Sequence, residues 1–210
     1  MITLAIDTST LRGSVALLVD SEFVLSETFV ADRTHSASLF TTLEKARALV
    51  PTVDQVAIGL GPGSFAGVRI AIAAALGLQL ALGCRLIGIP SAAVLDTTAD
   101  EFLVIGDARR EAFYFTRVHD GVCMEGPLLA SESELRARIE ARGAAPVFAT
   151  GTLAGFPEVQ IGLPSAEKLA RLSAAGRGIV QQDEIEPIYL REPHITFPRP
   201  VRATSALPES

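Results

Sequence analysis

Two short clusters contain the side chains whose types and spacing could do chemistry. Asp7, Thr8 and Ser9 follow one apolar run, and Asp107 and Arg109 follow another. A carboxylate beside hydroxyls can hold a magnesium ion or a phosphate, and an arginine can pair with a phosphate. The same residue types are common in turns, where their side chains bond the local backbone. We favour turn chemistry for the first cluster and a structural role for the second, with a relic nucleotide site as the alternative.

A glycine-rich segment, residues 59–70, could let another group approach the backbone closely, because glycine has no Cβ. It is not a P-loop, since Val68, Arg69 and Ile70 stand where lysine and Ser/Thr would be needed. Gly61, Gly63 and Ala66 fit a relaxed dinucleotide fingerprint, but no acidic residue ends a second strand at the expected distance. Ser64 lies outside the nucleophile-elbow pattern. We therefore expect a neighbouring helix, rather than a nucleotide, to approach here.

Composition narrows the classes of function. The chain has 210 residues and a net charge of −6, and only two of its 18 basic residues are lysines, which argues against autonomous nucleic-acid binding. Cys84 and Cys123 are isolated, as in a protein of a reduced compartment without a zinc site. The apolar run from Val68 to Leu82 is shorter than a bilayer span. We expect a cytoplasmic protein with no membrane segment.

Hydrophobic periodicity predicts an α/β chain whose pattern occurs twice. Each half begins with a strand meander carrying an aspartate at its first turn, and Asp120-Gly121 is a hairpin signal. The predicted lobes are residues 1–100 and a smaller, divergent 101–210 with a proline-rich tail, each a β-β-β-α-β-α unit, the second reduced. The predicted strands are 2–6, 14–19, 23–30, 53–58, 86–89, 102–107, 112–118 and 146–150, and the helices are 39–50, 68–83, 131–142, 164–175 and one from Ser91 onward.

The helix predicted for 68–83 is the strongest candidate for contact with another chain. It combines many small residues, whose side chains hardly project from the helix, with bulky apolar residues around most of its circumference. This combination indicates burial on more than one side. One side would pack on its own sheet and the other on a partner, although an ordinary internal helix would look alike. The predicted interface comprises Phe40, Leu43, Phe65, Val68, Arg69, Ile72, Ala73, Leu76 and Leu80.

Several motifs together resemble the TsaB (YeaZ) family, a companion subunit of bacterial tRNA threonylcarbamoyladenosine (t6A) synthesis. The resemblance is good over roughly the first 120 residues and returns at Pro187 to Arg191. The chain departs from the family at Ala66, where Thr is usual, and at Val68, where Leu is usual. The motifs are Ile6-Asp7-Thr8-Ser9-Thr10, Ser14-Val15-Ala16, His35-Ser36, Gly61 to Ile70, Gly88-Ile89-Pro90-Ser91 and Asp107-Ala108-Arg109-Arg110-Glu111.

The resemblance implies the ASKHA fold of actin, Hsp70 and sugar kinases. It also implies a non-catalytic subunit that binds and stabilises the catalytic TsaD (Kae1) subunit, joins the ATPase TsaE, meets tRNA only through the complex and forms a homodimer when alone. No cofactor is firmly implied, although relic ATP or ADP binding could use Asp7, Thr8, Ser9, Asp107 and Arg109.

The catalytic TsaD relatives carry a His-x-x-x-His metal pair, and Ser91 and Leu95 stand at the corresponding positions here. His35, His119 and His194 are far apart in sequence, so no metal site is expected. Three alternatives stay open: a small-molecule kinase of the same fold, a dimeric binding module with another client, and peptidase activity, which the missing metal pair disfavours.

Overall fold

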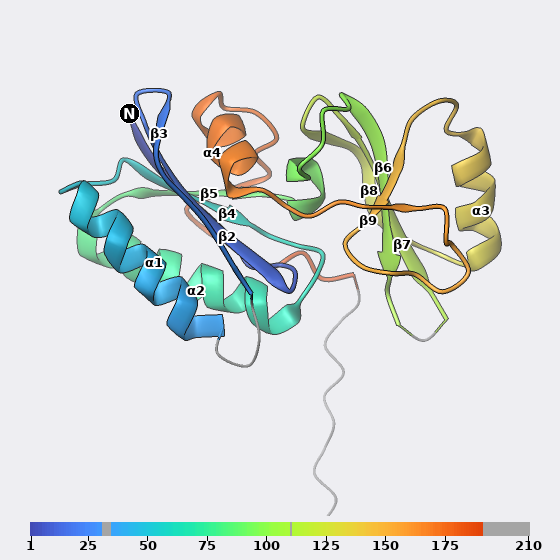
Figure 1. The fold of residues 1–210 in the computed structure, drawn as a ribbon, viewed down its shortest axis with the longest axis horizontal. Coiled ribbons are helices and arrows are strands. Elements are labelled where there is room, and N and C mark those ends of the chain that lie inside the picture. Colours follow the sequence, from blue (N-terminus) through green and yellow to red (C-terminus); the bar gives the residue numbers. More distant parts are fainter. Residues whose placement is uncertain (31–34, 110, 191–210) are drawn as a thin grey trace, which may run out of the picture.

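The computed structural model describes residues 1–30, 35–109 and 111–190, which form two β-sheets with helices packed on them (Figure 1). The first sheet has six strands in the order β11-β5-β4-β1-β2-β3. Strands β1 to β3 form an antiparallel meander, and β4 and β5 extend it in parallel to β1. The bounds are β1 (Ile2–Asp7), β2 (Arg12–Val19), β3 (Glu22–Val30), β4 (Gln55–Gly59), β5 (Arg85–Ile89) and β11 (Gln181–Gln182).

Alternating side chains give this sheet two different faces. Large residues such as Leu4, Ile6 and Ile58 are buried under α1 (His35–Leu49) and α2 (Phe65–Leu82). The opposite face carries the small side chains of Ala5, Ala16 and Ala57, and α4 (Ala166–Ala174) packs on it. Figure 1 shows α1 and α2 on one side of the sheet and α4 on the other.

The second sheet repeats the strand order of the first. Its order β10-β9-β6-β7-β8 corresponds to β5-β4-β1-β2-β3, with the same antiparallel meander and parallel extension. No helix lies between β9 and β10 in residues 150–159, so this lobe is reduced. The duplicated ASKHA architecture is confirmed. The bounds are β6 (Glu101–Asp107), β7 (Phe113–His119), β8 (Val122–Ala130), α3 (Glu132–Ala141), β9 (Val147–Ala149) and β10 (Gln160–Ile161).

Two helix predictions need correction. The helix expected from Ser91 is a single 3₁₀ turn, η1 (Ser91–Val94), followed by extended backbone at Leu95. Few residues separate η1 from β6, and the chain must cross from one sheet to the other within them. Helix α2 begins at Phe65 rather than Val68, because the Ser64 hydroxyl accepts a hydrogen bond from Gly67 N (3.2 Å) and caps it there.

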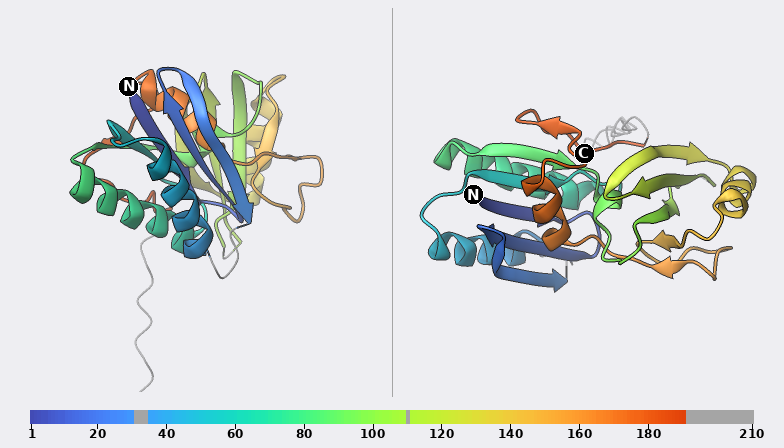
Figure 2. Two further views of the ribbon diagram at one scale, coloured as in Figure 1. Left: turned by 60° about the vertical axis from the view of Figure 1, so that its left-hand side comes forward. Right: turned by 90° about the horizontal axis from the view of Figure 1, so that it is seen from above.

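The boundary predicted at residue 100 also needs correction, because the chain returns to the first sheet after building the second. Strand β11 pairs with β5, and Gln55 Nε2 in β4 donates to Ser173 Oγ in α4 (2.9 Å). The two lobes also share one buried cluster that includes Ala5, Phe102 and Leu169. Figure 2 shows α4 lying against the first sheet. The sequence pattern did not reveal this return, because it depends on long-range packing.

Candidate functional site

The glycine-rich segment is occupied by the chain's own backbone. Ser64 N donates to Ser9 O (2.6 Å), and Thr8 Oγ1 donates to Gly67 O (2.7 Å). A Cβ on Gly63 would lie 2.1 Å from Ser9 O, and one on Gly67 would lie 1.9 Å from Thr8 O. The expectation that another helix approaches here is therefore corrected. Gly63 and Gly67 leave room for the turn that follows β1.

Asp7 lies beneath this turn and is fully buried. Its Oδ1 accepts hydrogen bonds from Ser9 N (2.9 Å) and Ser9 Oγ (2.7 Å), while Oδ2 has no hydrogen-bond partner among the described residues. Burial raises the pKa of Asp7, and the hydrogen bonds from Ser9 oppose that rise. A Cβ on Gly59 would lie 1.8 Å from Oδ2, so this glycine makes room for the carboxylate.

A cleft of about 370 Å³ lies between the two lobes. The lobes contribute hydroxyls and glycines from the turns that follow β1, β4 and β9, together with Asp107 at the end of β6 and Arg109 just after it. Asp107 Oδ1 accepts from Arg109 N (2.6 Å), and Arg109 has a positive φ of 62°. The lining residues are Ser9, Thr10, Leu11, Gly63, Ser64, Gly106, Asp107, Arg109, Tyr114, Ala149, Thr150, Gly151, Thr152, Leu153 and Leu190.

The predicted nucleotide residues thus divide into two groups. Ser9, Asp107 and Arg109 border the cleft, whereas the side chains of Asp7 and Thr8 are buried beneath it. Sequence reasoning missed Thr150 and Gly151. The duplication held a usable signal, because these residues follow β9 as the glycine-rich turn follows β4. The cleft could hold a small anion near Arg109, but Asp7 is too enclosed to hold a metal ion for it.

A second candidate site is the α2 outer surface, which we define as Phe65, Arg69, Ala73, Leu76 and Leu80. These side chains recur on one exposed side of the helix, with Phe65 51% and Leu80 89% exposed. The Arg69 guanidinium lies 4.9 Å from the centre of the Phe65 ring. Tyr189, from the segment after β11, packs against the same ring, with the two ring centres 5.7 Å apart and the ring planes tilted by 39°.

This surface is hollowed beside the tail of the described chain. A groove of about 290 Å³ runs between α2 and residues 186–189. The sequence did not reveal that the tail forms its second wall, because this contact joins segments more than 100 residues apart. The groove is lined by Arg69, Ile72, Ala73, Leu76, Glu186, Pro187 and Tyr189.

Comparisons with known proteins give the family. Residues 27–124 match the family model described as TsaD, tRNA N6-adenosine threonylcarbamoyltransferase. An uncharacterized protein of Mycobacterium tuberculosis is 32% identical and aligns over 90% of this chain and 92% of its own length. The tRNA threonylcarbamoyladenosine biosynthesis protein TsaB of Haemophilus influenzae is 29% identical over the same shares of the two chains. The chain belongs to the TsaB (YeaZ) family.

Solved structures of the TsaB (YeaZ) family agree. YeaZ from Pseudomonas aeruginosa is 28% identical with a TM-score of 0.67, over 90% of this chain and 99% of that one. A second Pseudomonas aeruginosa structure, described as similar to peptidase YeaZ, is 29% identical with a TM-score of 0.74 over the same shares. The chain spans 55% of the length of an uncharacterized Mycobacterium leprae relative, to which it is 32% identical.

Two of the interface residues expected for a TsaB-like chain need correction. Leu43 and Val68 are 6% and 3% exposed and belong to the core between the helices and the first sheet. Helical spacing identifies neighbours along a helix but not which side faces the sheet. Ile72 is also largely buried, although its edge reaches the groove. Phe40 is exposed on α1, as expected.

The positions of the TsaD-family histidines are enclosed here. Ser91 and Leu95 are both buried, and Ser91 Oγ accepts a hydrogen bond from Gly61 N (2.9 Å). His119 is exposed at the end of β7, while His194 lies outside the described residues. In residues 1–30, 35–109 and 111–190, no three His, Cys, Asp or Glu side chains gather closely enough to hold a metal ion.

Helix α2 is also the one helix in the described part of the chain that is long and apolar enough to cross a membrane. Its inner side packs on the first sheet, since Val68, Ala71 and Ala75 are buried in the core of the first lobe. A helix with one side packed on its own sheet cannot present its whole circumference to lipid, as a membrane-spanning helix does. The apolar residues of α2 therefore divide between the core and the α2 outer surface.

Proposed function

We propose that this chain is the non-catalytic companion subunit in t6A formation at adenosine 37 of tRNA and that it binds and stabilises a TsaD-type catalytic subunit. The observation that carries the proposal is the α2 outer surface. Phe65, Leu76 and Leu80 are large apolar side chains exposed on one side of one helix, beside an apolar groove. Contiguous exposed apolar surface marks a place where another protein binds. Without that subunit, the same surface would pair with a second copy of the chain.

The polar centre of the chain supports a companion role rather than a catalytic one. Asp7 is buried on Ser9 and cannot reach a ligand in the cleft, and Ser91 and Leu95 supply no imidazole for a metal ion. The net charge of −6, with two lysines, supports contact with tRNA through the complex rather than through this chain alone. The ATPase TsaE would join the same cytoplasmic complex.

Co-purification with the TsaD subunit of the same organism tests the docking surface. Ala73→Arg and Leu76→Glu each place a charge on the α2 outer surface and leave the core untouched, so both should abolish co-purification while the thermal midpoint stays within a few degrees. Leu128→Glu is the matched control, because Leu128 is an equally exposed apolar residue on β8 in the other lobe. Retained binding by both α2 variants, or equal loss in the control, would overturn the assignment of the surface.

The cellular role is tested separately by depleting the protein and measuring tRNA nucleosides by mass spectrometry. Loss of t6A is the expected result, and rescue should require the parent chain and fail with Leu76→Glu. Unchanged t6A after depletion would overturn the proposed function, whatever the binding experiment shows.

A further inference from the structure

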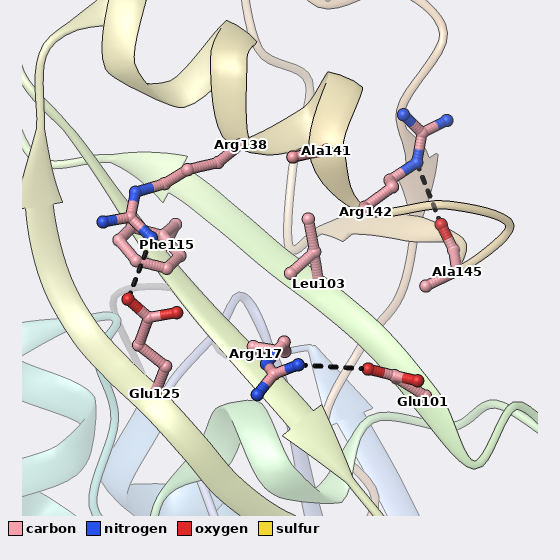
Figure 3. A pocket seen from close by; sticks show the side chains of 9 residues that line it. All are labelled: Glu101, Leu103, Phe115, Arg117, Glu125, Arg138, Ala141, Arg142 and Ala145. Atoms are coloured by element: carbon pink, nitrogen blue, oxygen red, sulfur yellow. Dashed lines mark hydrogen bonds and ion pairs between the residues drawn. The ribbon is translucent and has the colours of Figure 1, made fainter.

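A separate cavity of about 210 Å³ opens on the second lobe, which we call the α3 pocket (Figure 3). It arises because α3 covers only part of the sheet face. Phe115 lies under the helix, while Leu103 and Arg117, which pair across β6 and β7, continue the same face beyond it. Leu103, Phe115 and Ala141 give the pocket an apolar floor.

The rim of the α3 pocket alternates positive and negative side chains. Arg138 donates to Glu125 (2.9 Å) and stacks 3.8 Å from the centre of the Phe115 ring, so its guanidinium is held in place. Arg142 donates to backbone carbonyls, including Ala145 O (2.9 Å), and closes the end of α3. Figure 3 shows both groups at the margin of the cavity.

Arg117 is the rim arginine whose guanidinium N–H donors are available to a ligand. Its nearest carboxylate, Glu101, is 3.5 Å away, beyond a good charged hydrogen bond. Its guanidinium donates no hydrogen bond to any described residue. A guanidinium presents several N–H donors in a fork that matches a carboxylate in two-point contact. Arg117 and Glu101 are each about half exposed, so a ligand can reach both.

We propose that the α3 pocket binds a free amino acid with an aliphatic side chain of about the size of leucine. Its carboxylate would pair with Arg117, its ammonium with Glu101, and its side chain would rest on Leu103 and Ala141. A plain anion would face the carboxylates of Glu101 and Glu125, and a plain cation would face three arginines, so the alternating rim favours a zwitterion. The volume is below the ~300–1,000 Å³ of drug-sized sites, as suits so small a ligand.

Titration of three related probes into the full chain tests this proposal. Methyl NMR signals of Leu103 and Ala141 would follow L-leucine, N-acetyl-L-leucine, which lacks the ammonium, and L-leucinamide, which lacks the carboxylate. We expect saturable shifts with leucine and at least about tenfold weaker binding of either blocked analogue. Arg117→Gln and Glu101→Gln should each lose leucine binding. Arg85→Gln, an exposed arginine of the first lobe, is the matched control and should keep it.

Each contrary outcome is distinct. Equal binding of all three probes would show that the pocket recognises only the apolar side chain. Shifts that do not saturate with leucine would show that the pocket has no amino-acid site and that its charged side chains only pair with one another in solvent. Unchanged binding in Arg117→Gln would place any leucine site elsewhere. All three outcomes overturn this proposal. None of them bears on the proposed function, which depends on α2 in the other lobe.

Discussion

Replacing Gly67 with alanine should destabilise the chain, whereas the same change ten residues along α2 should stabilise it. A Cβ on Gly67 would stand 1.9 Å from the backbone oxygen of Thr8, and real Cβ contacts are essentially never below 3.0 Å. The β1 turn must therefore move by about 1 Å, which strains a packed backbone at a typical cost of 1–3 kcal/mol. That shift also weakens the hydrogen bond from Thr8 Oγ1 to Gly67 O, worth roughly 1 kcal/mol.

Gly77 is the internal control, because a Cβ there meets nothing within 4 Å. Alanine exceeds glycine in helix propensity by about 0.8–1.0 kcal/mol, which acts at both positions and is opposed by strain only at Gly67. We expect a net loss of ~2 kcal/mol for Gly67→Ala, or roughly 4–8 °C in thermal midpoint, and a gain of roughly 2 °C for Gly77→Ala.

Urea unfolding followed by circular dichroism, with a thermal scan, measures both variants. Equal stability of Gly67→Ala and the parent would refute the interpretation that the glycine makes room for the β1 turn. Equal destabilisation at Gly77 would show that the effect belongs to the helix as a whole.

Three further predictions follow from particular groups. Burial raises the pKa of Asp7 above 3.8, so the folded state binds the proton more tightly than the unfolded state, and stability falls as the pH rises from 3.8 through the folded-state pKa. Asp7→Asn should therefore reduce the pH dependence of the urea midpoint between about pH 4 and pH 7, and equal pH dependence in the variant and the parent would contradict this. Burial raises the pKa of Cys123 to about 12 and also raises that of Cys84. A thiol reagent at neutral pH should therefore label buried Cys84 only after unfolding and half-buried Cys123 much more slowly in the native chain than in the unfolded one, and equal labelling rates before and after unfolding would contradict this. Ser131→Ala removes the capping box that Ser131 and Glu134 form at the start of α3 and should cost about 1 kcal/mol by urea denaturation, with Ser26→Ala, at an exposed serine of β3, as the control that should change little.

Local patterns predicted most of the strands and the duplication, because strand alternation and turn chemistry depend on neighbours in the sequence. The Asp120-Gly121 hairpin, with φ values of 53° and 73°, is one example. Residue type also predicted that α2 is apolar on more than one side. It could not predict that Val68 faces the sheet while Ala73 faces outward, because that rotation is set by packing on β4 and β5.

The site was less accessible to sequence reasoning than the fold. Glycine at 63 and 67 predicted a close approach, but only the three-dimensional structure identifies the approaching group as the backbone of Ser9 and Thr8. Asp7 followed the expected strand, yet its burial depends on Gly59, which lies far away in the sequence. A close approach involves two segments, and the sequence of one segment does not identify the other.

The buried cluster shared by the two lobes has a mechanical consequence. Separating them would expose part of large side chains such as Phe102, Val104 and Tyr114, and complete exposure of a buried Val or Phe side chain costs roughly 1.5–3 kcal/mol. A hinge between the lobes would have to break this contact whenever it moved. The shared cluster therefore opposes opening of the cleft, and a partner bound at α2 would be coupled through it to the second lobe.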